Sequence, residues 1–330
     1  MRVERQRLVE LARREVETRV EKNGLLAAYL IGSVVSGEPV LGGSADIDLV
    51  LIHENPPTPE REIVPLSEDV HFDIAHHGRA RYALPRQLRV DPWLGPAVYA
   101  PLSLFDRDHL FEWAQAGARG QYPRADFARQ RASSLLDSAR HLRDSLATTS
   151  YWPSTYVGAV LTGANAIASL AAPPACGRRA MLLLEARLAQ AGHSEIYSAV
   201  LELIGAAGLQ SRTAPDHVGA WARAYDVCAR ITGEPLLSRH RRAYHLKGFQ
   251  ALLEEGAPQA LLPGLLQTWD RVMGTLETFE LAANHRDDWQ AALSALGLSA
   301  DSTAARTAAL EDYLDHIEIT LEAWGREHGA

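Results

Sequence analysis

Hydrophobic residues recur every three or four positions over the first twenty residues, with charged residues between them. The apolar positions run from Val3 to Val20 and fall on one side of a helical projection. The pair Asn23-Gly24 follows, and both residues commonly end helices. The segment therefore predicts an amphipathic helix at the start of the chain.

Two short apolar runs come next and are typical of strands that are covered on both faces. They are LLAAYLI, residues 25–31, and DIDLVLIH, residues 46–53. The connection between them contains Gly37, Gly42 and Gly43, so its backbone can fold tightly, with room for a short helix at most.

A hairpin and one more strand complete the predicted sheet. Residues 61–66 (REIVPL) and 70–77 (VHFDIAHH) flank a polar turn at residues 67–69. Residues 78–96 are rich in Arg and Pro and predict an irregular or short-helical connection. Residues 98–106 (VYAPLSLFD) are then a further strand candidate, and a helix is expected over 109–122.

From about Arg124 the pattern changes to long helical periodicities rich in Ala and Leu, separated by Pro and Gly. We find no further strand there and no repeat of fixed length. The sequence predicts an α+β fold, with a mixed β-sheet domain at residues 1–122 followed by an all-helical domain at residues 123–330.

Composition narrows the class of protein. A length of 330 residues suits two domains. The formal net charge of −8 argues against a nucleic-acid partner, because that affinity depends on clustered Lys and Arg. No run is apolar enough for a signal peptide or a membrane span, so we expect a cytoplasmic protein with no membrane partner. Cys176 and Cys228 are too isolated for a disulfide framework or a zinc knuckle.

The strongest chemical signal is the Asp-x-Asp pair in the second apolar run. Side chains two apart on a strand share a face, so Asp46 and Asp48 project together. Two neighbouring carboxylates repel each other unless a cation neutralises them. Mg²⁺ suits such a pair, because it takes one or two protein carboxylates and keeps water and phosphate oxygens in its shell.

Two other features complete the candidate site. Asp73 lies in the middle of a later strand and would reach the same ion, or a second one, if that strand is adjacent to the strand of Asp46 and Asp48. The Gly32-Ser33 turn offers a backbone without side-chain bulk and a hydroxyl that can donate to a phosphate oxygen. Together these residues predict a metal-dependent phosphate-transfer site.

The string LIGSVVSGEPVLGGSADIDLVLIH, followed by the Asp of VHFDIAHH, resembles the signature of the DNA polymerase beta-like nucleotidyltransferase superfamily. Within that superfamily, a sheet domain with a helical domain behind it resembles the aminoglycoside nucleotidyltransferases and related bacterial proteins. The resemblance covers about residues 1–120 by motif, and the remainder only by general helical character.

By this resemblance, Gly32 and Ser33 bind a nucleoside triphosphate, and Asp46, Asp48 and Asp73 are the catalytic residues that hold two Mg²⁺ ions. The implied reaction moves AMP from ATP to a hydroxyl of a small molecule, such as an aminoglycoside-like antibiotic, in a role in antibiotic resistance. Asp73 or a carboxylate of the helical domain would take the proton. The base preference of the nucleotide and the oligomeric state stay open.

Alternative interpretations exist for several residues. His71 and His77 share the face of Asp73 and suggest a zinc site, although structural histidines are the simpler interpretation. Asp106 and Asp108 are typical of a turn or a helix cap. The cluster Arg239, Arg241, Arg242 and Lys247 is either a solvated face or a triphosphate contact, and the aromatics Tyr151, Trp152 and Tyr156 either pack in a core or line an acceptor pocket.

A second hypothesis belongs to another class of function. The N-terminal half would be a nucleotidyltransferase-like module that modifies or only binds a protein, in the manner of an antitoxin or a regulatory protein. The helical half would then be an interaction surface.

Overall fold

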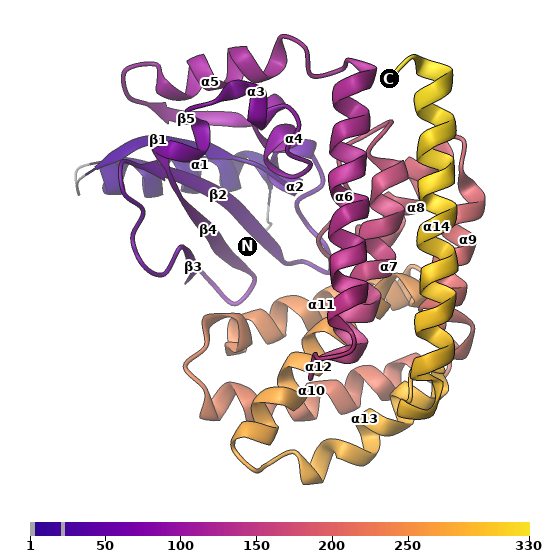
Figure 1. The fold of residues 1–330 in the computed structure, drawn as a ribbon. Helices are drawn as coiled ribbons and strands as arrows, with labels where there is room; N and C mark the ends of the chain where they lie inside the picture. Colours follow the sequence, from indigo (N-terminus) through magenta and orange to yellow (C-terminus); the bar gives the residue numbers. More distant parts are fainter. Residues whose placement is uncertain (1–3, 21–23) are drawn as a thin grey trace. The chain divides into compact units, whose positions relative to one another are not determined.

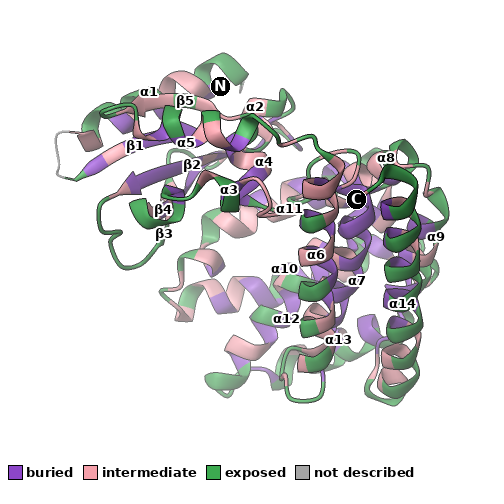
Figure 2. Cartoon of the chain, turned by 45° about the horizontal axis from the view of Figure 1, so that its top comes forward, coloured by how far each residue is buried: buried purple, intermediate pink, exposed green. Residues whose placement is uncertain are grey.

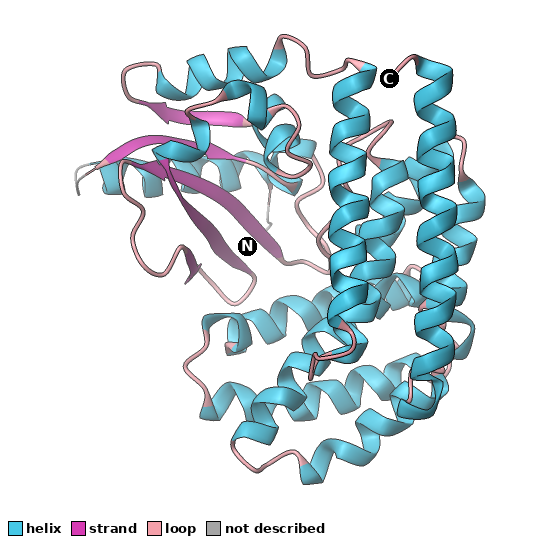
Figure 3. Ribbon diagram, in the orientation of Figure 1, coloured by secondary structure: helices cyan, strands magenta, loops and turns pink. Residues whose placement is uncertain are grey.

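The structure, a computed structural model, describes residues 4–20 and 24–330. It confirms the α+β class, with a sheet in the N-terminal part and helices after it (Figure 3). The chain divides into two compact units, Met1–Phe127 and Ala128–Ala330. The boundary expected between residues 122 and 123 precedes helix α6, which begins at Ala125. Val3 and Asn23, which the sequence places at the ends of the first helix, lie outside the described residues.

The first unit contains the sheet and its covering helices (Figure 1). In chain order its elements are α1 (Arg5–Val20), β1 (Leu25–Leu30), α2 (Ser33–Ser36), β2 (Ala45–His53), β3 (Arg61–Pro65), β4 (Val70–Gly78), the 3-10 helix η1 (Arg79–Tyr82), α3 (Pro85–Leu88), α4 (Leu94–Tyr99), β5 (Leu102–Asp106) and α5 (Leu110–Arg119).

The five strands form one mixed sheet in the order β3-β4-β2-β1-β5. Strand β2 is antiparallel to β1 and parallel to β4, whereas β3 and β4 form the antiparallel hairpin that the sequence predicts. Strand β3 follows β2 in sequence, but β4 lies between them in the sheet. The chain therefore forms the edge strand β3 first and then turns back to place β4 between β3 and β2.

Each face of the sheet is covered by its own apolar core. On one face, Leu8, Ala12 and Val16 of α1 pack against residues of β1, β2 and β4, which include Ile47 and Phe72. On the other face, the segments η1, α3, α4 and α5 cover a second cluster. Strand β2 is accordingly drawn in the colour of buried residues along most of its length (Figure 2). Two covered faces explain why the apolar runs of β1 and β2 are nearly continuous.

The expected strand over residues 98–106 is wrong at its start. Val98 and Tyr99 end helix α4, and β5 begins only at Leu102, after Pro101. Val98 is fully buried in the second core, so its apolar character reflects helix packing rather than a strand. Asp106 accepts the backbone N–H groups of Phe111 and Glu112 at 2.9 and 2.8 Å, which confirms it as a helix cap.

The second unit, residues 128–330, contains no strand. Its elements are α6 (Ala125–Ser145, which begins in the first unit), α7 (Trp152–Ala168), α8 (Ala180–Gln190), α9 (Ser194–Leu203), η2 (Ala206–Gly208), α10 (Ala214–Ile231), η3 (Pro235–Leu237), α11 (Arg239–Glu254), η4 (Pro258–Leu261), α12 (Leu262–Thr278), α13 (Ala283–Ala295), η5 (Ala300–Ser302) and α14 (Thr303–His328).

Helix α7 forms the centre of this unit and packs against α8, α9, α12 and α14. Gly163 of α7 allows close packing, because a Cβ there would lie 2.8 Å from a methyl group of Leu314. The buried Asp270 of α12 accepts from the backbone N–H and the hydroxyl of Ser154, at 3.0 and 2.6 Å, and so caps the first turn of α7. Long helices α6 and α14 run side by side, linked by ion pairs such as Arg143–Glu311 (Figure 1).

Within residues 4–20 and 24–330, no helix has the length and apolarity needed to cross a membrane.

Replacing Ile47 by alanine tests the role of the core beneath the candidate site. Ile47 is fully buried against α1, so Ile47→Ala should destabilise the protein by about 2–5 kcal/mol. Urea-induced unfolding followed by circular dichroism measures this change. The control is Ile319→Ala, at a side chain that is 62% exposed, which should alter stability by no more than about 0.5 kcal/mol. Equal effects of the two substitutions would contradict the assignment of Ile47 to the core.

Candidate functional site

Strands β2 and β4 lie side by side, and their register places Asp48 directly opposite Asp73. Asp46 pairs with His71, two positions along the same strands. Adjacent strands are separated by about 4.8 Å, and paired residues project from the same face. The condition set by the sequence, that the strand of Asp73 neighbours that of Asp46 and Asp48, is met.

The three carboxylates differ in burial. Asp73 is only 7% exposed, whereas Asp46 and Asp48 are half-buried. Farther along the same face of β2, Val50 and Ile52 belong to the second apolar core. The acidic residues therefore lie next to this apolar core, where water alone screens their charges poorly.

The Gly32-Ser33 turn lies against Asp48. The backbone N–H of Ile31 donates to the carbonyl of Asp48 at 3.1 Å, which holds the end of β1 beside the acidic pair. Gly32 follows with φ of +69°, and a Cβ on it would lie 2.1 Å from Oδ2 of Asp48. Only glycine allows both this backbone conformation and this close approach. Ser33 then begins α2, in which the carbonyl of Val34 is bound by Nε of Arg5 at 2.7 Å.

The apolar segment between Ser33 and Asp46 is accounted for by the core. Pro39 and Leu41 are buried, and Leu41 pairs with Ser44 across a tight turn. The turn residues Gly42 and Gly43 both have positive φ, which confirms the expectation that glycine lets this connection fold tightly.

Arg61 is the functional candidate that the sequence analysis missed. Its Nε donates to Oδ1 of Asp73 at 2.7 Å, and its Nη2 donates to Oδ2 at 2.5 Å. Ile63 pairs with Asp73 across the hairpin and Arg61 pairs with Ala75, so Arg61 reaches Asp73 diagonally on the same face. The sequence contains the information for this contact. Counting outward from the predicted hairpin turn at residues 67–69 pairs Ile63 with Asp73 and Arg61 with Ala75.

The charge of Arg61 interacts with the whole acidic group. Its hydrogen bond to Asp73, and attraction from Asp73, Asp48 and Asp46, raise the pKa of the guanidinium despite the opposing effect of burial. All three carboxylates therefore lie within electrostatic reach of one cationic side chain.

The chemistry of these residues fits a hard divalent cation. Three carboxylates supply the oxygen ligands that Mg²⁺ prefers, and the absence of a Cβ at Gly32 leaves room for the carboxylate of Asp48 among them. Among the residues that the structure describes, however, no group of three or more His, Cys, Asp or Glu side chains is drawn together in a geometry that would hold a metal. The cation that the structure itself places beside Asp73 is the guanidinium of Arg61.

The nearby histidines have hydrogen-bonding roles of their own. As the alternation of β4 predicts, His71 and His77 lie on the face of Asp73, and His76 lies on the opposite face. Nδ1 of His77 lies 2.6 Å from the hydroxyl of Tyr82. Burial, and next the charge of Arg81, lower the pKa of His77 to about 4, so its imidazole is neutral at pH 7. This contact favours a structural role for His77 over the zinc interpretation.

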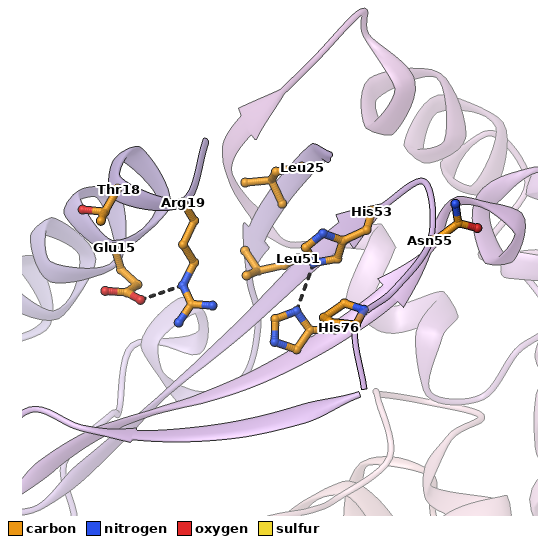
Figure 4. A pocket seen from close by; sticks show the side chains of 9 residues that line it. Glu15, Thr18, Arg19, Leu25, Leu51, His53, Asn55 and His76 are labelled. Atoms are coloured by element: carbon orange, nitrogen blue, oxygen red, sulfur yellow. Dashed lines mark hydrogen bonds and ion pairs between the residues drawn. The ribbon is translucent and has the colours of Figure 1, made fainter. Parts of the chain in front are cut away.

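A polar cavity of about 460 Å³ lies on the face of the sheet that α1 covers. Figure 4 shows the side chains of Arg19, His53 and His76 converging on it. Arg19 donates to both oxygens of Glu62 at 3.0 Å and to Glu15 at 2.6 Å. Its bond to Glu62 is the main reason that the pKa of Glu62 is lowered.

The imidazoles of His53 and His76 form a hydrogen-bonded chain with Glu62 in this cavity. Glu62 is ionised and can only accept, so Nε2 of His76, at 3.2 Å, carries the proton. Nδ1 of His76 lies 3.0 Å from Nε2 of His53, within hydrogen-bonding distance. Burial, followed by the charges of His76 and Arg19, lowers the pKa of His53 and keeps it neutral. No sequence pattern pointed to this cluster, because its members come from α1, β2, β3 and β4.

The helical unit contains the aromatic and basic residues that the sequence suggested for an acceptor pocket or a triphosphate contact. Tyr156 is fully buried and packs in the core, the half-buried Trp152 stacks on it with ring centres 4.9 Å apart, and Tyr151 is 42% exposed. In the basic cluster, Arg242 pairs with Asp226 at 2.7 Å. The guanidinium of Arg241 lies 4.9 Å from the ring centre of Tyr244.

Comparison of the chain with models of known protein families gives no match, and comparison with curated proteins gives none either. The fold and the geometry of the site are therefore the observations from which a function is inferred.

Replacing Gly32 by alanine should weaken binding of a divalent cation by about 10–100-fold, because the added Cβ displaces the carboxylate of Asp48. Mn²⁺ titration followed by calorimetry measures this. Gly43→Ala is the matched control: its φ of +74° imposes a similar backbone cost, but a Cβ there meets nothing within 4 Å. The expectation fails if both variants bind Mn²⁺ with the affinity of the unmodified protein.

The neutral state of His77 predicts a pH dependence of stability. Because the pKa of His77 is about 4 in the folded chain and ordinarily 6.5, acid adds protons to the unfolded chain first. The stabilisation is complete above pH 6.5 and is lost as the pH falls towards about 4. In thermal melts across this range, His77→Gln should show a shallower loss than the unmodified protein. The exposed His141→Gln is the control, and parallel profiles for all three would refute the assignment.

Proposed function

We propose that the chain is a divalent-cation-dependent nucleotidyltransferase that moves AMP from ATP to a hydroxyl group of a small molecule. The observation that carries the proposal is the pairing of Asp48 with Asp73 beside Gly32, which gathers carboxylates and an open backbone turn at one end of a sheet face. The resemblance of LIGSVVSGEPVLGGSADIDLVLIH to the nucleotidyltransferase signature supports the same reaction.

In the proposed reaction the acceptor hydroxyl oxygen forms a bond to the α-phosphorus of ATP. The bond from that phosphorus to the bridging oxygen breaks, and pyrophosphate leaves. Two Mg²⁺ ions, when bound, would neutralise the charge that develops on the attacking and leaving oxygens. Asp46, Asp48 and Asp73 would hold them, and Asp73 would take the hydroxyl proton.

The turn residues orient the triphosphate. Gly32 carries no side chain where the carboxylate of Asp48 approaches, and the half-buried Ser33 can donate its hydroxyl to a phosphate oxygen. Catalysis then depends mainly on positioning and on neutralising charge, as is general for phosphoryl and nucleotidyl transfer.

An aminoglycoside-like antibiotic is the proposed acceptor. These compounds carry several amino groups and are cationic at neutral pH, whereas the chain has a formal net charge of −8. An acidic protein attracts a polycationic substrate and raises its local concentration. The family resemblance of the sheet-plus-helix organisation points to the same class.

Incubation with ATP, Mg²⁺ and a panel of aminoglycosides should release pyrophosphate and yield a small molecule heavier by one adenylyl group in mass spectrometry. Asp48→Asn should slow this reaction on the order of 10²–10³-fold, because it removes a charge that holds the metal. Glu54→Gln, at an exposed residue just beyond β2, is the isosteric control and should retain the activity.

The same measurement distinguishes the other class of function. An adenylylated protein in place of an adenylylated aminoglycoside would identify a protein acceptor. Absence of any product, with ATP bound, would refute the transferase and leave a binding module.

A further inference from the structure

The carboxylate of Asp73 is bound at both of its oxygens by a side chain of the same sheet. Arg61 donates from Nε at 2.7 Å and from Nη2 at 2.5 Å, the two-point contact that suits a guanidinium and a carboxylate. A metal ion coordinated by Asp73 would need these same oxygens. The guanidinium and the ion are therefore competitors for one ligand.

The two partners of this ion pair differ in their freedom to move. Asp73 is 7% exposed on β4, inside the sheet, whereas the side chain of Arg61 is 57% exposed on the edge strand β3. An arginine side chain that is 57% exposed can turn into water once an ion takes its place beside the carboxylate. The buried carboxylate stays in place, so the side chain that moves is Arg61.

The reach of Arg61 is not limited to Asp73. Asp48 pairs with Asp73 across β2 and β4, so the positive charge of Arg61 also acts on the carboxylate of Asp48. The side chain therefore neutralises part of the charge of the whole group of carboxylates.

We propose that Arg61 is a positioning residue that acts as the internal counter-ion of the acidic site: it holds Asp73 in place of a metal ion and sets the concentration of divalent cation at which Asp73 becomes a ligand. This inference rests on the proposed function, because it takes Asp46, Asp48 and Asp73 as the cation ligands. A purely structural ion pair at the sheet edge is the contrasting interpretation, and it makes a different prediction.

The affinity of Arg61→Gln for a divalent cation distinguishes the two interpretations. Loss of a structural ion pair lowers stability and leaves cation affinity unchanged. Loss of a competing counter-ion also lowers the stability of metal-free protein, but it tightens binding of Mn²⁺ by at least about tenfold, since one positive charge no longer occupies the ligand.

The experiment uses full-length protein freed of metal by chelation, with Mn²⁺ alone as the probe and Mg²⁺ in a parallel series. The half-saturating concentration is measured by calorimetry and by the shift of the thermal midpoint. Arg61→Lys keeps the charge but loses the two-point contact, so its half-saturation should lie between those of the unmodified protein and Arg61→Gln. It also keeps the test available if Arg61→Gln does not fold.

Arg79→Gln is the matched control. Arg79 has the same 57% side-chain exposure as Arg61, but it pairs with Glu54, at 3.2 Å, instead of with one of the three proposed cation ligands. This variant should leave the half-saturating concentration of Mn²⁺ unchanged.

Asp48→Asn makes the failure of this inference distinguishable from failure of the proposed function. If Asp48→Asn abolishes the Mn²⁺ response while Arg61→Gln leaves half-saturation unchanged, the cation site stands and the role of Arg61 is overturned. If neither the unmodified protein nor Arg61→Gln responds to Mn²⁺ or Mg²⁺, the cation requirement of the proposed function fails, and this inference fails with it.

Discussion

The parallel pairing of β2 with β4 is the constraint on which the rest of the sheet unit depends. Apolar residues fix its register: Ile47 and Leu49 of β2, together with Phe72 and Ile74 of β4, fill the core beneath α1. A shift of one residue in either strand would turn that strand's apolar set out of this core, so the register is strongly specified. The same register brings Asp48 and Asp73 together. Hydrophobic burial thus stabilises an arrangement of like charges that is unfavourable by itself and that calls for a positive partner.

Strand β3 supplies a charged partner to each face of the sheet, because its successive side chains point to opposite faces. Arg61 projects to the face of Asp73 and binds it, while Glu62 projects to the opposite face and binds Arg19 and His76. Edge strands carry exposed charged residues in many proteins, because such residues discourage pairing with other chains. Here Arg61 and Glu62 also bind residues farther inside the sheet. The edge strand therefore carries exposed charges and at the same time contributes to the electrostatics of the site.

Local patterns in the sequence were sufficient for most elements but not for their pairing. The periodicity from Leu8 to Val16, the apolar run of β2 and the polar turn at 67–69 each depend on neighbouring residues, and each prediction is confirmed. The position of β4 between β3 and β2 depends on contacts between distant segments, which no local pattern contains. Arg61 was missed because its role needs both the hairpin register and that strand order. The early start expected for β5 failed because burial of Val98 in a helix and in a strand leaves the same apolar signal.

The close approach at Gly32 is a feature of this end of the sheet that an acidic composition alone does not produce. An Asp-x-Asp pair arises easily in an acidic chain and needs nothing from the residues before it. Here a different segment, the end of β1, brings a backbone with φ of +69° to where a Cβ would lie 2.1 Å from the carboxylate of Asp48. Any other residue would adopt this conformation at a cost and would clash with Asp48, so the contact requires glycine. A turn whose backbone must stay bare beside one carboxylate, next to a second carboxylate held by Arg61, is the arrangement on which the proposed nucleotide site rests.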